Sequence, residues 1–195
     1  MGKTYDTRTI LVANQKGGVG KTWLADELCF MCENADMPYT LRDYDGQGGL
    51  NHVPVESDDP ALVIIDTPGA LQPQLQEWIR EADMILVPTL MTKQCMEPLD
   101  RMIEILKPWK RMGKEVIIVL NQWDRFTACS DFEEWFFTKH KGENTMILSA
   151  SEVVKQAIEH NQSVVNYKKH SKSAREMMVF YDAIMTILYK EKVRG

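Results

Sequence analysis

The sequence lacks the features of a membrane-spanning or secreted protein. No stretch of its 195 residues approaches the roughly 20 consecutive apolar residues that a membrane-spanning helix needs. Residues 1–6 contain no hydrophobic core of a signal peptide. Only four cysteines are present, and without secretory features they indicate free thiols rather than a disulfide framework. We therefore expect a cytoplasmic protein.

Metal-ligand spacing and internal boundaries are also absent. The four histidines are scattered, and Cys29 and Cys32 form a C-x-x-C pair without a second pair. Both cysteines share the apolar face of an expected helix with Leu24 and Leu28, so core packing explains them better than metal binding. No linker, repeat or low-complexity segment interrupts the chain. With 44% hydrophobic residues, the chain is sufficient for one compact domain spanning residues 1–195.

Strands and helices are expected to alternate along the chain. Three Ser-x-x-Glu capping boxes, beginning at Ser130, Ser149 and Ser173, predict helix starts. Pro98 predicts the first turn of a helix that ends near Leu106, because the Lys-Pro pair that follows discourages continuation. The alternation predicts an α/β fold with a doubly wound, mostly parallel sheet and helices on both faces. The expected strands are residues 9–13, 39–42, 62–65, 84–87, 116–120 and 145–148.

Residues 16–22 read Lys-Gly-Gly-Val-Gly-Lys-Thr and follow the apolar run at residues 10–13. Glycines allow backbone N–H groups to converge on a phosphate, and the following helix adds the positive end of its dipole. Lys21 can then reach the β- and γ-phosphates, and the Thr22 hydroxyl can ligate Mg²⁺. A simple glycine turn is the alternative, but a strand-like run before it and a helical pattern after it disfavour that interpretation. The segment predicts a nucleoside triphosphate site formed by Gly17, Gly18, Val19, Gly20, Lys21, Thr22 and Trp23.

An acidic residue, Asp66, directly follows the apolar residues 61–65. Four consecutive apolar residues that end in Asp66 are typical of a strand buried on both faces, with its carboxylate at the edge where a doubly wound sheet holds its ligand. Asp66 there can hold Mg²⁺ through water, and Gly69 allows a backbone N–H to approach the γ-phosphate. A buried strand ending in aspartate is, by itself, a common structural feature.

The phosphate loop and the segment at residues 41–49 together resemble the ParA/MinD family of dimeric, deviant P-loop ATPases. The resemblance implies the P-loop NTPase fold of that family, with ATP and Mg²⁺ as cofactors. It also implies that Lys16 crosses a dimer interface to the nucleotide of the partner subunit, where a second cation would stabilise the transferring phosphoryl group. Taken alone, Lys16 is equally well explained as a solvated surface charge.

The segment at residues 41–49 is similar to the family's D-x-D-P-Q-G motif at Asp43, Asp45, Gln47 and Gly48. Gly46 departs from the pattern, because the family has proline at that place. The resemblance implies that Asp45 orients the attacking water. It also implies that Asp43 supports the Mg²⁺ ligands Thr22 and Asp66. A solvated Asp-Gly turn is the structural alternative.

The buried strand expected at residues 116–120 delivers Asn121 and Asp124 to the same edge of the sheet. A side-chain amide can recognise adenine, so we predict both residues as base contacts. The N-x-x-D spacing is also similar to the N-K-x-D motif of GTPases, although Gln122 replaces the lysine. The other motifs favour ATP over GTP.

A basic segment near the C-terminal end contrasts with the net charge of −5. Residues 167–175 contain four cationic side chains and no acidic one, and they resemble the DNA-contacting region of ParA proteins. Such a patch predicts salt-sensitive DNA binding without sequence preference, with a solvated basic loop as the alternative. The four residues are Lys168, Lys169, Lys172 and Arg175.

The resemblance to small ParA partition proteins implies a function with several partners. These are a second copy of the chain, bound in an ATP-dependent sandwich dimer, nucleoid DNA, and a cargo-bound adaptor of ParB type that stimulates hydrolysis. We expect no helix-turn-helix, no amphipathic membrane helix, and a nucleoid-associated location. Two alternatives remain open. One is a metabolic enzyme similar to dethiobiotin synthetases, and the other is a GTP-dependent maturation factor.

Overall fold

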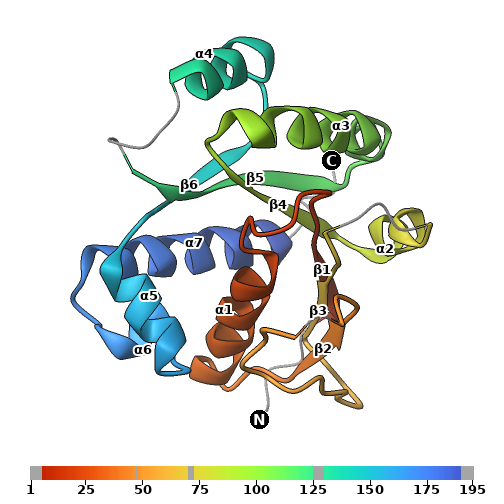
Figure 1. Ribbon diagram of the computed structural model, residues 1–195. Helices are drawn as coiled ribbons and strands as arrows, with labels where there is room; N and C mark the ends of the chain where they lie inside the picture. The colour runs from red at the N-terminus through yellow and green to blue at the C-terminus, as the bar shows by residue number, and fades with distance from the viewer. Residues whose placement is uncertain (1–5, 47, 70–72, 125–129, 190–195) are drawn as a thin grey trace.

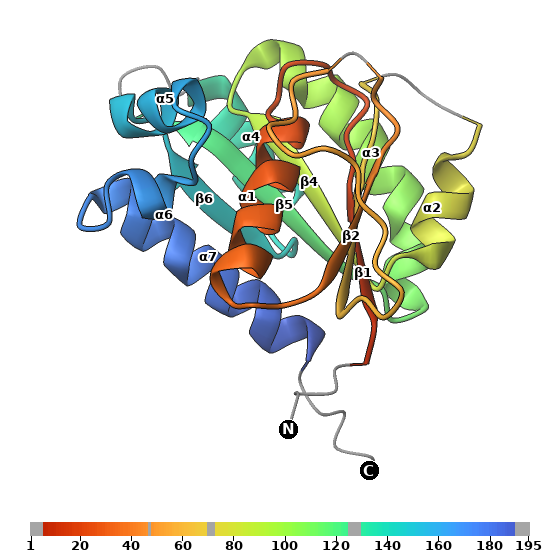
Figure 2. The same ribbon diagram turned by 90° about the horizontal axis from the view of Figure 1, so that it is seen from below.

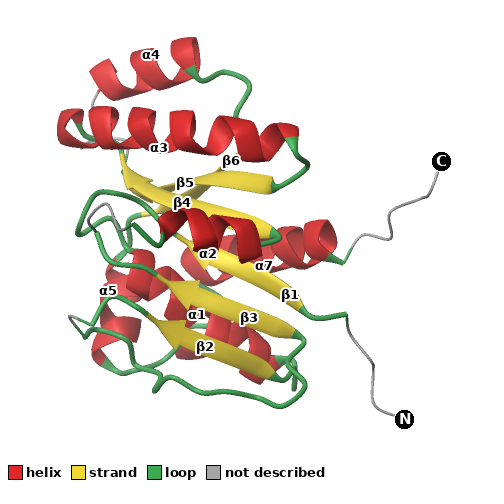
Figure 3. Cartoon of the chain, turned by 90° about the vertical axis from the view of Figure 1, so that its right-hand side faces the viewer, coloured by secondary structure: helices red, strands yellow, loops and turns green. Residues whose placement is uncertain are grey.

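The computed structural model describes residues 6–46, 48–69, 73–124 and 130–189. Its centre is one six-stranded sheet in the order β2-β3-β1-β4-β5-β6, and all the strand pairs are parallel (Figures 1 and 3). All six expected strands are confirmed, each within a few residues. Their bounds are β1 Arg8–Val12, β2 Tyr39–Asp43, β3 Leu62–Asp66, β4 Met84–Leu90, β5 Glu115–Trp123 and β6 Thr145–Ser149.

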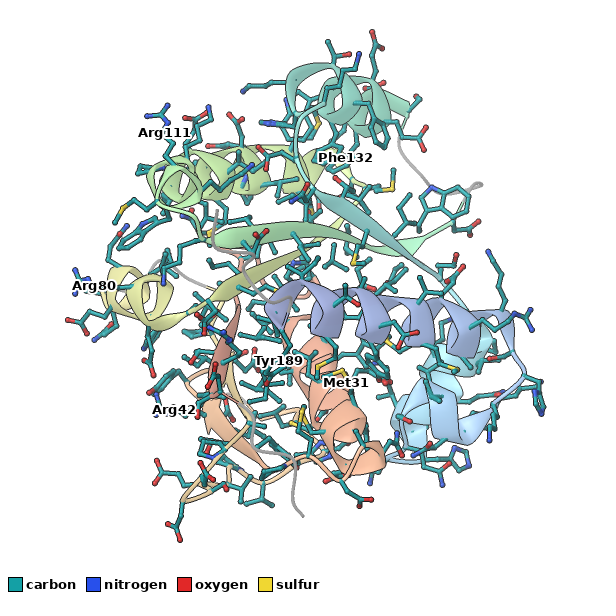
Figure 4. The ribbon with its side chains drawn as sticks, turned by 180° about the vertical axis from the view of Figure 1, so that it is seen from behind. Met31, Arg42, Arg80, Arg111, Phe132 and Tyr189 are labelled. Atoms are coloured by element: carbon teal, nitrogen blue, oxygen red, sulfur yellow. The ribbon has the colours of Figure 1, made fainter. Side chains whose placement is uncertain are left out.

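Helices cover both faces of this sheet, as the alternation of elements predicts. Figure 2 shows α1 (Lys21–Asn34) and α7 (Lys172–Leu188) on one side of the strands, with α2 (Leu75–Glu81) and α3 (Lys93–Arg111) on the other. The α4 helix (Ser130–Lys139) packs outside α3, and Figure 4 shows its buried Phe132 directed toward that helix. The short α5 (Glu152–Glu159) and α6 (Val164–Tyr167) lie beside α7 (Figure 1).

The strand residues divide between the two layers by alternation. In β1, Ile10 and Val12 pack in the cluster that contains α1 and α7, whereas Leu11 packs in the cluster that contains α2, α3 and α4. Because successive side chains of a strand point to opposite faces, a strand in a doubly covered sheet is apolar throughout. This explains why β3 is buried from Leu62 to Asp66.

The α3 helix is longer than the sequence predicts. It begins at Lys93, so Pro98 lies more than a full turn inside it, and it continues past Pro108 to Arg111. An internal proline costs a helix roughly 3 kcal/mol. The buried face formed by Leu99, Met102, Ile103 and Leu106 offsets that cost by packing on the sheet. The expected end near Leu106 is therefore wrong, because tertiary burial outweighs the local signal.

Two of the three predicted helix caps, at Ser149 and Ser173, are wrong, because a nearby serine caps the helix in each case. The α5 helix is capped by Ser151, which accepts from the N–H of Val153, and α7 is capped by Ser171, which accepts from the N–H of Ala174. Ser149 instead donates its hydroxyl and its N–H to the carboxylate of Glu176. The third expected start is in place, since α4 begins at Ser130.

A buried polar contact joins α1 to the C-terminal helices. The Glu27 carboxylate accepts from the Tyr181 hydroxyl of α7 and from the N–H of Val164 in α6. Burial raises the pKa of Glu27 to about 7, although both hydrogen bonds favour the charged form. The neighbouring thiols of Cys29 and Cys32 are free and fully buried, which confirms their packing role. Among the described residues, no helix is both long and apolar enough to cross a membrane.

Candidate nucleotide-binding site

A pocket of about 1060 Å³ lies where β1, β2 and β3 end, at the carboxyl edge of the parallel sheet. Doubly wound sheets hold ligands at this edge, close to the point where the order of the strands in the sheet reverses. The pocket brings together residues from the phosphate loop, from the turn after β2, from the loop after β3 and from α2. Its lining residues are Gly17, Gly18, Gly20, Lys21, Thr22, Tyr44, Asp45, Pro68, Gly69, Gln74, Trp78 and Gln122.

The phosphate loop leaves its backbone donors available. The N-cap of α1 is Gly20, and no side chain caps the first turn, so the N–H groups that begin this helix face the pocket without a side-chain acceptor. Gly20 has a left-handed φ of 93°, and a Cβ there would lie 2.2 Å from Nδ2 of Asn121. At Gly69, a Cβ would lie 2.9 Å from the backbone of Gly17. Glycine at both positions therefore keeps a narrow backbone cradle open.

Lys21 is the buried cation of this cradle. It is only 4% exposed, and its ammonium donates to the carbonyl of Lys16 at 3.3 Å. Burial lowers the pKa of Lys21, while the carboxylates of Asp66 and Asp45 act in the opposite direction. A buried ammonium with one weak carbonyl partner retains donors for an anion such as a phosphate.

Asp66 is fully buried, and neither of its carboxylate oxygens makes a hydrogen bond of normal geometry with a described residue. Burial raises the pKa of Asp66 to about 6, Thr22 and Lys21 lower it, and Asp43 and Asp45 raise it. Such an unpartnered carboxylate beside Thr22 fits a divalent cation. Within the described residues, no group of three or more His, Cys, Asp or Glu side chains could hold a metal alone. Mg²⁺ would therefore take most of its ligands from phosphate and water, as it does in other nucleotide sites.

The two aspartates after β2 lie in different positions. Asp43 ends β2 directly opposite Asp66 in the register, and its carboxylate accepts from the N–H of Asp45 at 2.9 Å. Asp45 lines the pocket, and its buried Oδ1 has no hydrogen-bond partner among the described residues. Asp43 thus shapes the turn, while Asp45 lines the site. Gln47 lies outside the described residues.

Lys16 is half-buried beside the pocket and is held by its backbone. Its N–H donates to Oδ1 of Asn14 at 3.1 Å, and its carbonyl accepts from Lys21. Its ammonium makes no hydrogen bond or ion pair with any described part of the chain. The charge is therefore available to a group outside this subunit.

The structure gives the predicted base contacts different surroundings. Asn121 is 3% exposed, and its amide donates to the carbonyl of Val19 at 3.0 Å, so it contacts the phosphate loop. Gln122, with a left-handed φ of 53° next to an irregularity in β5, lines the pocket, whereas Asp124 does not. Trp23 packs against the core rather than lining the pocket.

Five lining residues were not among the predicted site residues, namely Tyr44, Pro68, Gln74, Trp78 and Gln122. The aromatic Tyr44 between the two aspartates was a visible signal. Gln74 and Trp78 carry no local signature, because they reach the pocket only through the docking of α2 on the sheet.

The basic residues at the other end of the chain lie at and beyond the turn from α6 to α7. Lys168 and Lys169 are exposed and make no ion pair among the described residues. Lys172 pairs with Glu176 at 3.2 Å, and Arg175 donates to the carbonyl of His170 at 2.9 Å. The tertiary structure therefore leaves two of the four predicted DNA contacts fully available.

No protein-family model matches this chain, and no curated protein matches it in sequence. Solved structures match it over nearly their whole length. An ATP complex of a Cyanothece McdA variant is 14% identical with a TM-score of 0.72, covering 93% of this chain and 97% of that one. MinD from Pyrococcus horikoshii with Mg-ADP is 14% identical with a TM-score of 0.69, covering 93% and 97%.

A third similar structure is a plasmid partition protein of Borrelia burgdorferi bound to AMPPNP. It is 14% identical, with a TM-score of 0.68, and the match covers 92% of this chain and all of that one. The chain therefore has the fold of the ParA/MinD P-loop ATPases.

Proposed function

We propose that this protein is a ParA-type ATPase that hydrolyses ATP with Mg²⁺, forms an ATP-dependent sandwich dimer, binds DNA without sequence preference and positions a cargo such as a plasmid. One observation carries the proposal: Lys21 and Asp45 line one glycine-rich pocket, and the charge of the buried Asp66 acts on Lys21 there. Both oxygens of Asp66 and the Oδ1 of Asp45 lack a hydrogen-bond partner among the described residues. The names of the similar structures, which include a plasmid partition protein and two nucleotide-bound ATPases of this fold, support the same class.

The binding steps follow from the chain's own groups. The uncapped N–H groups at the start of α1 and the Lys21 ammonium bind the β- and γ-phosphates. Thr22 and Asp66 would hold Mg²⁺, which would neutralise charge on the phosphate oxygens. The Lys21 ammonium places a second positive charge beside the phosphoryl group that is transferred to water.

Hydrolysis needs an oriented water and stabilisation of the charge that develops. In this mechanism the Asp45 carboxylate, which lines the pocket, accepts a hydrogen bond from the attacking water and aligns it with the γ-phosphate. Lys16, whose ammonium is unpaired within the described part of its own subunit, reaches the nucleotide of the partner subunit. A second subunit would thereby complete each site, which makes turnover dependent on the dimer.

We propose that DNA binds to the turn between α6 and α7. Its exposed Lys168 and Lys169 neutralise phosphates without reading bases. The α1 helix begins at the phosphate loop and is joined to α6 through the bond from Val164 to Glu27. The basic turn and the nucleotide site are therefore connected through α6 and α1. We propose that a cargo-bound adaptor of ParB type stimulates release from DNA.

The proposal is tested by measuring the molar mass of the protein by light scattering with ADP, ATP and GTP, and its binding to unrelated DNA duplexes under the same conditions. We expect a dimer only with ATP, and DNA binding that the dimer strengthens. A chain that stays monomeric with ATP and consumes it only with a small-molecule acceptor would be a metabolic enzyme. A preference for GTP would instead indicate a maturation factor.

A further inference from the structure

Tyr44 and Trp78 form a flat aromatic stack at the edge of the nucleotide pocket. Their ring centroids are 4.7 Å apart and their planes differ by 9°. Tyr44 stands between Asp43 and Asp45, whereas Trp78 belongs to α2, and both residues line the pocket. The stack therefore joins the turn after β2 to a helix that is distant in the sequence.

Hydrogen bonds also hold the backbone at Tyr44 and Asp45. Its N–H donates to the carbonyl of Asp66 at 3.0 Å, and the next N–H, that of Asp45, donates to Asp43. Beyond Asp45 the chain continues through Gly46, Gly48 and Gly49, which all have left-handed φ values that glycine adopts readily. The stack therefore restrains this turn together with the Asp43 carboxylate, which accepts from the N–H of Asp45.

The exposure and contacts of Tyr44 indicate that the stack restrains the turn and that the Tyr44 hydroxyl takes no part in catalysis. Tyr44 is 44% exposed although it is a large aromatic residue, and its hydroxyl has no hydrogen-bond partner among the described residues. An aromatic pair at this distance is attractive beyond its buried area. The ring, and not the hydroxyl, therefore carries the contact.

We propose that Tyr44 and Trp78 are positioning residues for Asp45, and that their stack keeps the Asp45 carboxylate directed at the water that attacks the γ-phosphate. The inference rests on the proposed ATP hydrolysis. Asp45 does not belong to a strand, since β2 ends at Asp43, and its Oδ1 has no hydrogen-bond partner in the part of the chain that the structure describes. Its orientation depends on the residue before it, and a small displacement of such a group lowers a rate strongly.

The first test compares Tyr44→Ala with Tyr44→Phe by measuring kcat and KM for ATP and the affinity for ADP. We expect Tyr44→Ala to lower kcat by about ten- to a hundredfold, since misplacement of a reacting group has that effect. The affinity for ADP should stay within about twofold, because the phosphate loop is untouched. Tyr44→Phe keeps the ring and should restore most of kcat. The matched control is Phe137→Ala, which removes a half-exposed ring from α4, away from the pocket.

A second test asks whether Tyr44 acts through Asp45. In an Asp45→Ala background, Tyr44→Ala should cause no further loss of kcat, because the group that it positions is already gone. Losses that multiply would overturn the proposal, as would a Tyr44→Phe variant as impaired as Tyr44→Ala. Trp78→Phe provides a milder change on the other side of the stack, and it should lie between wild type and Tyr44→Ala.

These outcomes separate the inference from the proposed function. A wild-type protein that hydrolyses ATP, with a Tyr44→Ala variant of equal kcat, overturns the positioning role alone. A wild-type protein that binds ATP but releases no phosphate, with or without DNA, overturns the proposed hydrolysis and the positioning role together. A variant that loses ADP affinity and kcat in parallel assigns the stack to general stability of the site, which also overturns the positioning role.

Discussion

The side-chain amide of Asn121 donates to the carbonyl of Val19 at 3.0 Å, which ties the end of β5 to the phosphate loop. The two residues are 102 positions apart in the sequence, so only the parallel sheet brings them together. The contact leaves no room at Gly20, where a Cβ would lie 2.2 Å from the same amide. Asn121 therefore supports the shape of the loop that binds phosphate.

Gly20→Ala should abolish ATP binding, because the methyl group collides with Asn121 and the left-handed φ of 93° is strained for alanine. Binding of a fluorescent ATP analogue measures this. Gly113→Ala is the matched control, since Gly113 has a φ of 86° but nothing within 4 Å of its Cβ position. That control should lose roughly 1 kcal/mol of stability and keep its nucleotide affinity. Equal affinities in both variants would show that the cradle does not bind nucleotide.

Lys21→Ala should remove measurable ATP binding, because the buried ammonium is the cation that faces the phosphates. A titration followed by calorimetry measures the loss. Lys155→Ala, which changes an exposed lysine of α5, should bind ATP as the wild type does. Wild-type affinity in Lys21→Ala would contradict the phosphate-loop assignment.

Lys16→Ala should separate binding from dimerisation. Its ammonium has no partner within the described part of its own subunit, so the monomer should bind ATP with nearly unchanged affinity while the ATP-dependent dimer weakens. Sedimentation velocity with ATP, over a range of protein concentrations, measures the dimer. A dimer of unchanged affinity would rule out a role for Lys16 across the interface.

Glu27→Gln should flatten the dependence of stability on pH. Burial raises the pKa of Glu27 from its ordinary value of 4.5 to about 7, so the folded state holds this proton more tightly than the unfolded state. The resulting stabilisation is complete below about pH 4.5 and is lost as the pH rises through 7. A shift of this size corresponds to about 3 kcal/mol.

Urea unfolding at several pH values between 4.5 and 8 measures this change, and Glu159→Gln, an exposed position on α5, is the control. Asp66 and His52 also have raised pKa values, so part of the slope should remain in the Glu27→Gln variant. An unchanged slope would contradict the assignment of a buried proton to Glu27.

Lys168→Ala combined with Lys169→Ala should weaken DNA binding more than Lys172→Ala combined with Arg175→Ala. The first pair is exposed and unpaired among the described residues, whereas Lys172 is already compensated by Glu176. Each lost phosphate contact should reduce the slope of log affinity against log salt by about 0.9. Fluorescence anisotropy with two unrelated duplexes measures both quantities. Equal slopes in all variants would indicate that the basic segment is a solvated loop.

Much of the fold follows from local patterns. Residues 62–66 are apolar up to a terminal aspartate, and this pattern alone predicts a doubly buried strand with its carboxylate at the ligand edge. The glycines and lysines at residues 16–22 similarly predict the phosphate loop, because few other sequences permit such a backbone. The predicted helix bounds are wrong where a local sequence signal is outweighed by packing against distant residues. Pro98 and Pro108 predict a short helix, yet the buried face of α3 carries it through both.

The order of the motifs along the chain is already visible in the sequence: a phosphate loop, then a pair of aspartates, then a buried aspartate. Periodicity and glycine placement are properties of neighbouring residues, so they can be read directly. Long-range packing alone brings Asn121 to the phosphate loop and stacks Trp78 on Tyr44, because each contact joins segments that are far apart in the chain. The Lys172–Glu176 pair is different, since it is an i,i+4 contact within α7 and depends on where that helix begins. That start is capped by Ser171 rather than by the serine that the pattern favours.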